Sequence, residues 1–184
     1  MATDVTRVMV EEHRLILRMI ALVEHNTARL EAGRFDDWHF YLDAVDFIRN
    51  YADRFHHAKE EDVLFVELVG NGMPAKRSPI EAMLIEHDRG RVHVLAIEAA
   101  AKQALAGEPG QEAILAEHAN GYAALLRGHI EKEDTILYPL AERVLPAEIR
   151  GRMLQAYAAA AAQTPGLEEK YRQLVARYEA QRAA

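Results

Sequence analysis

The chain has 184 residues, half of them apolar and 28% charged, which is typical of one globular domain with a buried core. Acidic residues outnumber basic ones by 29 to 22, the net charge is −7, and no long basic run occurs, so we expect neither nucleic acid nor a membrane as a partner. The chain has no cysteine, which excludes disulfides, thiolate metal sites and a cysteine nucleophile.

Apolar residues recur at spacings of three and four along most of the chain, which predicts helices and no strands. Asp36 or Asp37 can cap the second helical segment, and Ser78-Pro79 followed by Glu81 forms a capping box for the third. Glycine and proline separate the segments. We predict helices over residues 4–31, 36–69, 79–106 and 110–144, followed by shorter helices over 147–162 and 166–181.

Four long helices with short connections predict an all-α fold, an antiparallel up-down four-helix bundle with one or two additional C-terminal helices. We assign residues 1–145 to the bundle and 146–184 to a helical extension that packs on it or on a partner subunit. Aromatic residues form a stripe on the second helix, namely Phe40, Phe47, Tyr51 and Phe55. Either the C-terminal helices or a second copy of the chain in a homodimer should cover this stripe.

Each of the four long helices can aim one histidine into the core. At about 100° per residue, His13, His87 and His129 lie at the centre of the apolar faces of the first, third and fourth helices. The second helix offers two neighbouring residues. His56 lies at the border of its apolar arc, whereas His57 lies about 100° further into a polar face, so we place His57 outside the site.

A glutamate follows two of these histidines by one helical turn, Glu60 after His56 and Glu133 after His129. In an up-down bundle all of these side chains meet at one end. Burying them without partners would cost several kcal/mol, whereas two cations bridged by two carboxylates remove that cost. Imidazole with carboxylate suits iron best, with manganese or zinc as alternatives. We therefore predict a two-metal site formed by His13, His56, Glu60, His87, His129 and Glu133.

The motifs around these residues resemble the hemerythrin-like (HHE cation-binding) domain over roughly residues 5–145. They are Glu12-His13-Arg14, His-x-x-Lys-Glu-Glu-x-x-Leu-Phe from His56, Glu86-His87-Asp88, and His-x-x-Lys-Glu-x-x-x-Leu-Tyr-Pro from His129. The resemblance implies a four-helix bundle with a non-heme di-iron centre, two bridging carboxylates and often an oxo or hydroxo bridge. Oxygen-carrying members have a fifth histidine where this chain has Arg91. The four-His, two-Glu set is closer to di-iron proteins of iron–sulfur cluster repair and nitric oxide response.

Two classes of function follow. The first is a cytoplasmic di-iron protein that binds oxygen, nitric oxide or peroxide for sensing, storage or the response to oxidative or nitrosative stress. The second is a di-iron enzyme that scavenges peroxide or nitric oxide, or that donates iron for iron–sulfur cluster repair. A third, weaker alternative is a metal-free helical interaction module. We expect a cytoplasmic location because residues 1–7 lack the basic and apolar regions of a secretory signal.

Four further residues carry expectations of their own. His118, Glu24 and Glu98 each lie eleven residues from a predicted ligand, so they should meet at the opposite end of the bundle as a polar network or facing solvent. A second metal site there is a weaker alternative. Tyr122 lies two turns from His129, and its phenol either packs in the core or lines a channel for ligands.

Overall fold

The computed structural model describes residues 4–183, and this part of the chain contains helices and no strands. The expected all-α class is confirmed. Residues 1–3 and 184, at the outer ends of the two expected domains, lie outside the described residues. The elements are α1 (Arg7–Glu31), α2 (Trp38–Phe47), the π-helical segments η1 (Ile48–His57) and η2 (Glu60–Leu64), α3 (Phe65–Gly70), α4 (Pro79–Leu105), α5 (Gln111–Lys132), the π-helical segment η3 (Glu133–Leu137), α6 (Tyr138–Val144), α7 (Ala147–Ala162) and α8 (Leu167–Ala183).

The helix starts follow the capping signals in the sequence. The side chain of Asp37, and not that of Asp36, accepts a hydrogen bond from the backbone nitrogen of Phe40 at 3.3 Å and caps α2. Ser78 caps α4 by accepting from the backbone nitrogen of Glu81 at 3.4 Å, with Pro79 as the first helical residue. These side-chain oxygens satisfy backbone N–H groups that have no partner within the helix.

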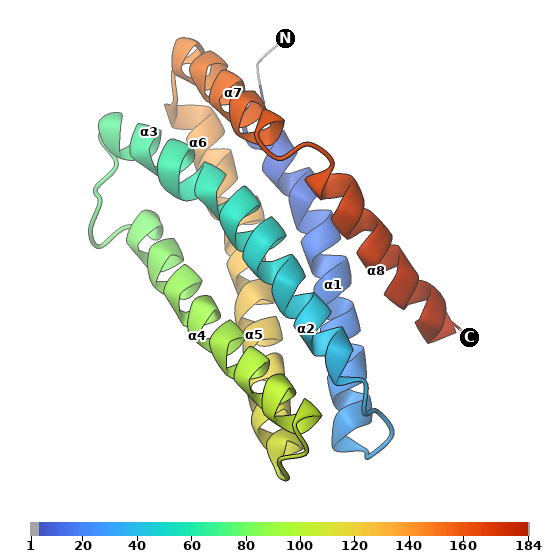
Figure 1. Ribbon diagram of the computed structural model, residues 1–184. Helices are drawn as coiled ribbons and strands as arrows, with labels where there is room; N and C mark the ends of the chain where they lie inside the picture. The colour runs from blue at the N-terminus through green and yellow to red at the C-terminus, as the bar shows by residue number, and fades with distance from the viewer. Residues whose placement is uncertain (1–3, 184) are drawn as a thin grey trace.

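Long helical rods lie side by side in Figure 1, and some of them consist of several consecutive elements. One rod runs from α2 through η1 and η2 into α3, and another runs from α5 through η3 into α6. α4 packs along α5 and α2, and α1 packs along α5. α7 lies at the end of the molecule near α3 and α6, whereas α8 runs beside α1. None of the helices in residues 4–183 combines the length and apolar character that a membrane crossing needs.

Helix α8 covers the aromatic stripe of the second rod. The ring of Tyr178 packs edge-on against Phe40 at 4.9 Å between centroids, and the ring of Tyr171 packs against Phe47 at 5.4 Å. The Tyr171 hydroxyl also donates a hydrogen bond to the Asp46 carboxylate at 2.9 Å. Within one chain, the C-terminal extension therefore buries the stripe, and the homodimer stays a prediction.

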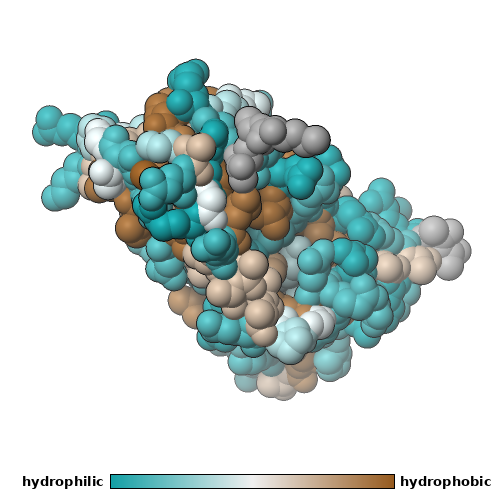
Figure 2. All heavy atoms as spheres, turned by 90° about the horizontal axis from the view of Figure 1, so that it is seen from above, coloured by the Kyte–Doolittle hydropathy of each residue, from teal (hydrophilic) through white to brown (hydrophobic). Residues whose placement is uncertain are grey.

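The buried apolar residues form two clusters, and a polar layer separates them along every rod. In α1, for example, Met9 belongs to the smaller cluster and Leu15 to the larger, and buried His13 lies between them. The smaller cluster fills the end of the molecule near α3, α6 and α7, where α7 contributes Met153 and Tyr157. Figure 2 looks onto this end and shows mostly hydrophilic side chains, with hydrophobic ones between them.

Candidate metal centre

Seven buried histidine and glutamate side chains meet in the polar layer: the six predicted ligands and His57. Their nitrogen and oxygen atoms form two groups, and within each group these atoms lie within 4.8 Å of one another. One group comprises His13, His56, Glu60 and Glu133, and the other comprises His57, Glu60, His87 and His129. Because Glu60 belongs to both groups, the two groups are adjacent.

Four of the imidazoles form two pairs. In each pair the two histidines come from different, neighbouring rods. The Nε2 atoms of His13 and His56 lie 2.9 Å apart, and those of His87 and His129 lie 3.0 Å apart. In both pairs the Nε2 atoms therefore point toward a common point in the interior.

The two carboxylates each contact both imidazole pairs. Glu60 Oε2 lies 3.8 Å from Nε2 of His56 and 3.5 Å from Nε2 of His87. Glu133 lies 3.4 Å from Nε2 of His13 and 3.1 Å from Nε2 of His129. A carboxylate in this position, between two groups of nitrogen donors, can bridge two cations.

Each of the five imidazoles turns its other nitrogen, Nδ1, toward a carboxylate. A carboxylate only accepts hydrogen bonds, so Nδ1 carries the proton and the Nε2 lone pair is left for the interior. Histidines that bind metal ions in proteins usually have such a partner, which fixes the ring and its tautomer. The pairs are His13 with Asp134 (2.8 Å), His56 with Glu12 (2.9 Å), His57 with Asp53 (3.3 Å), His87 with Glu61 (2.6 Å) and His129 with Glu86 (3.0 Å).

The placement of His57 on a polar face is wrong. Its side chain is 7% exposed, and its ring stacks on that of His87 at 3.7 Å between centroids. The prediction assumed an α-helix, with about 100° of rotation per residue. The segment η1 is π-helical instead, with hydrogen bonds from i to i+5, so each residue advances the chain by a smaller angle. Two successive residues, His56 and His57, therefore both face the interior.

Three buried carboxylate oxygens have no hydrogen-bond partner: Oε2 of Glu60 and both oxygens of Glu133. The imidazole nitrogens nearest to Glu133 lie at 3.1 and 3.4 Å, outside the geometry of a hydrogen bond. Leaving such oxygens bare inside a protein costs about 1–3 kcal/mol each, and more for a charged group. Oxygen and imidazole donors without thiolate suit iron, manganese or zinc, so these residues fit a pair of such cations.

The charges of the two glutamates differ in the absence of metal. Burial and the negative charge of Glu133 raise the pKa of Glu60 well above its ordinary value. Burial alone would raise the pKa of Glu133 too, but His129 and His13 hold it well below its ordinary value. Burial likewise opposes the charge on His13, yet Asp134 and Glu133 raise its pKa to about 9. Protons on Glu60 and His13 thus supply positive charge where cations would.

Sequence reasoning missed the groups that hold the ligands in place. The Tyr138 hydroxyl donates to Glu60 Oε1 at 2.5 Å, and its ring stacks on His13 at 5.5 Å between centroids. Glu12 bonds to His56 and also to the buried ammonium of Lys59. The motifs contained these residues: a glutamate stands directly before His13 and before His87, and Tyr138 stands five residues after Glu133. These residues act across helices, so the spacing along one helix did not identify their partners.

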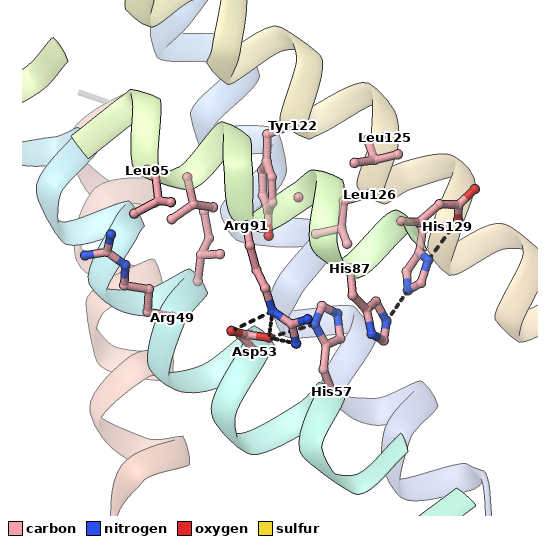
Figure 3. Close-up of a pocket in the computed structure, with 14 residues that line it drawn as sticks. Arg49, Asp53, His57, His87, Arg91, Leu95, Tyr122, Leu125, Leu126 and His129 are labelled. Atoms are coloured by element: carbon pink, nitrogen blue, oxygen red, sulfur yellow. Dashed lines mark hydrogen bonds and ion pairs between the residues drawn. The ribbon is translucent and has the colours of Figure 1, made fainter. Parts of the chain in front are cut away.

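A pocket of about 170 Å³ lies beside the His87–His129 pair (Figure 3). Apolar side chains of η1, α4 and α5 form most of its walls, and Arg91 spans one side by pairing with Asp53 and Glu61 at 2.7 and 2.8 Å. Tyr122 packs in the larger apolar cluster, as the core alternative expected, and it also lines the pocket; whether the pocket is a channel for ligands stays a prediction. Three imidazoles lie at one end of the pocket and Leu95 lies at the other, and the remaining lining residues include Ile48, Gly90, Val94, Leu125 and Leu126.

The predicted meeting of His118, Glu24 and Glu98 is wrong, because each has a different partner. Glu24 pairs with Arg127 at 2.6 Å, and Glu98 pairs with Arg49 at 2.5 Å. His118 faces His93, with their Nδ1 atoms 3.1 Å apart. The eleven-residue spacing predicts the level of each residue along the bundle. It does not predict which side chain of a neighbouring helix each residue contacts.

Comparison with known proteins agrees with the geometry. The sequence model of the family described as the hemerythrin HHE cation binding domain matches residues 4–141. Uncharacterized proteins from Mycobacterium bovis and from two strains of Mycobacterium tuberculosis are 26% identical over 140 residues. The matched stretch is 76% of this chain but only 54% of each relative, so the chain spans about half the length of these proteins. No solved structure matches the chain significantly.

Proposed function

We propose, from the premise that this chain belongs to the hemerythrin HHE cation-binding domain family, that it is a non-heme di-iron protein. Its centre binds oxygen, nitric oxide or peroxide for sensing, storage or the response to oxidative or nitrosative stress. The ligands of the two iron ions are His13, His56, Glu60, His87, His129 and Glu133.

The bare carboxylate oxygens of Glu60 and Glu133 are the observation that carries this proposal. Each glutamate lies between imidazoles of both pairs, and the Nε2 atoms of those imidazoles face inward. Two cations would compensate the buried charge and use the free oxygens. Iron, when bound, supplies the redox chemistry and a coordination position for a small ligand. The polypeptide fixes the imidazole tautomers through the Nδ1 carboxylates and surrounds the ligands with apolar side chains.

We also propose that residues 1–145 form an up-down four-helix bundle and that residues 146–184 are an extension of it. Support comes from the packing of α4 against α5 and α2, and of α1 against α5. The contacts of α8 with α1 and η1 support an extension that packs on the outside of those rods. A chain that ends near residue 145 should therefore keep its metal ligands but expose the aromatic stripe of α2 and η1.

Metal analysis and optical spectra test the proposed centre. Protein expressed in iron-rich medium should contain about two irons per chain. The anaerobically reduced, iron-loaded protein should change its optical spectrum on addition of oxygen or of nitric oxide. One iron or none in well-folded protein would contradict the dinuclear centre, and an unchanged spectrum with both ligands would contradict small-ligand binding.

The pocket favours a second candidate function, a di-iron enzyme that scavenges peroxide. The pocket has a volume of about 170 Å³ and reaches three imidazoles of the centre, so a small reactant such as peroxide has space beside the iron ligands. Repeated consumption of hydrogen peroxide by iron-loaded protein with an added reductant would distinguish an enzyme from a sensor. A sensor would react once per centre and then stop.

A further inference from the structure

We infer that the pocket beside the His87–His129 pair admits the small ligand, and that Nε2 of His57 accepts a hydrogen bond from it there. The ligand class is then one that carries its own proton, hydrogen peroxide rather than oxygen or nitric oxide. This inference rests on the proposed function, because it assumes that iron occupies the two groups of donors.

The pocket reaches one side of the centre. His57, His87 and His129 line it, and Tyr122 forms part of the wall above them (Figure 3). On the other side of the centre, the ring of Tyr138 stacks on His13. A ligand that enters from solvent past Leu95, which is 60% exposed, therefore arrives at the His87–His129 pair.

The side that the pocket reaches has no additional metal donor from α4. Apart from His57, each side offers two imidazoles and the two carboxylates of Glu60 and Glu133, which contact both imidazole pairs. Arg91 occupies the nearby position on α4, but a guanidinium has no lone pair to give, and it is held by Asp53 and Glu61. A vacant coordination position is thus expected on the side that the pocket reaches.

His57 is placed to meet a ligand rather than to bind iron. Its ring lies almost parallel to that of His87, at an interplanar angle of 12° and 3.7 Å between centroids. The lone pair of an imidazole nitrogen lies in the plane of its ring, so two stacked rings cannot both direct a lone pair at one ion. His57 therefore stands beside the coordination position and lines the pocket.

The Asp53 carboxylate determines which kind of hydrogen bond His57 can make. Asp53 can only accept, so Nδ1 of His57 carries the proton and Nε2 is an acceptor. An acceptor at this position stabilises hydrogen peroxide, which has O–H groups, and offers nothing to oxygen or nitric oxide, which have none.

The first experiment compares peroxide with nitric oxide in iron-loaded His57→Leu. Hydrogen peroxide takes one electron from each of two ferrous ions and two protons from solvent to give two water molecules, and the optical spectrum follows this reaction. We expect about two irons per chain, a peroxide reaction about 3- to 10-fold slower, as one lost hydrogen bond implies, and an unchanged Kd for nitric oxide. His93→Leu, in the edge-to-face pair with His118 away from the centre, should change neither.

The outcomes separate the inference from the proposed function. Loss of iron in His57→Leu would overturn the inference, because His57 would then be a ligand. Equal changes with peroxide and nitric oxide, or no change with peroxide, would overturn it as well. Wild-type protein without about two irons would instead contradict the proposed function. If His57→Leu folds poorly, Asp53→Asn keeps the imidazole and frees its tautomer, and it should weaken the preference for peroxide.

The second experiment tests the route. Leu95→Trp places a bulky ring at the mouth of the pocket, and Val92→Trp places the same ring on the exposed face of α4 outside it. We expect Leu95→Trp to slow the association of nitric oxide and the reaction with peroxide, while Val92→Trp leaves both unchanged. Equal rates in the two variants would show that the ligand does not enter through this pocket.

Discussion

The two halves of the centre, from α1 to α3 and from α4 to α6, repeat the same contacts in different surroundings. Glu12 bonds to His56 and Lys59 in the first half, as Glu86 bonds to His129 and Lys132 in the second. The motif therefore specifies partners across neighbouring rods as well as residues along one rod.

The surroundings of these contacts differ between the halves. The Lys59 side chain is 2% exposed, and its ammonium lies 3.3 Å above the ring of Phe55, whereas the Lys132 side chain is 41% exposed. Tyr138 of the second half also donates to Glu60, while Phe65 at the aligned position of the first half has no hydroxyl to offer Glu133. The comparison teaches that equal motifs can have unequal burial, so we expect their contacts to contribute unequal free energies.

The largest effect is expected at the bridging glutamates, where the halves meet. Glu60→Ala removes a donor that both groups share, so it should lose both metal ions. Glu133→Ala should lose at least one ion and the oxo-bridge absorption, because less negative charge then separates the two cations. Metal analysis and the optical spectrum measure both results.

Helical content should survive in both glutamate variants, because the apolar clusters are unchanged, and circular dichroism checks this. His118→Ala, whose imidazole contacts His93 away from the centre, should keep its metal and its spectrum. Iron loss in His118→Ala as large as in Glu133→Ala would refute the one-end geometry.

The second prediction uses the unequal burial of the two lysines. Lys59→Met leaves Glu12 buried without its ammonium partner and should lower the free energy of unfolding by about 3 kcal/mol. Lys132→Met breaks a partly exposed pair and should cost about 0–1 kcal/mol. Urea unfolding with a metal chelator present measures both values. Equal losses would mean that burial does not distinguish the halves.

The third prediction concerns a substitution that makes the two halves more alike, because the aligned residue of the first half is Phe65. Tyr138→Phe removes the hydroxyl that bonds to Glu60 and leaves another buried oxygen bare. We expect the metal-free protein to lose about 1–3 kcal/mol of stability in urea unfolding. Loading with metal should reduce this loss, because the freed oxygen gains a cation. A loss that stays the same with and without metal would contradict the role of Glu60 as a bridge.

The smallest effect is expected at the ion pair of Glu98 in α4 with Arg49 in η1, which joins the halves. Arg49 and then Lys102 lower the pKa of Glu98 to about 2. A lowered folded pKa means that the stabilisation is present above the ordinary value of 4.5 and is lost as the pH falls through about 2. Glu98→Gln should therefore cost less than about 1 kcal/mol at pH 7, and the difference from wild type should disappear below about pH 2.

Much of this architecture follows from spacing in the sequence. The three- and four-residue periodicity gave helices whose ends agree with the structure to within a few residues, since Pro79 and the caps Asp37 and Ser78 mark real starts. The same periodicity centred His13, His87 and His129 on apolar faces, and the one-turn spacing from histidine to glutamate added His56, Glu60 and Glu133; all six meet in the polar layer, together with His57. Whether these six hold iron stays a prediction.

Other features depended on information that spacing does not contain. The π-helical turns of η1 moved His57 inward, and nothing in the residue pattern announced the change from i+4 to i+5 bonding. The carboxylate partners of the imidazoles depend on the relative register of neighbouring rods, as the bond between His13 and Asp134 illustrates. Met153 and Tyr157 of α7 belong to the smaller apolar cluster, and their place there depends on tertiary packing in the same way.

The polar layer between the two apolar clusters ties the folding equilibrium to metal supply. A chain without cations folds around bare carboxylate oxygens, whose lost hydration lowers its stability. A cation that binds only the folded chain adds about 1.4 kcal/mol of stability for each tenfold rise in its free concentration above the Kd. The midpoint of thermal unfolding should therefore rise with the logarithm of free metal. Proteases attack unfolded chains, so we expect the lifetime of this protein in a cell to depend on the metal available to it.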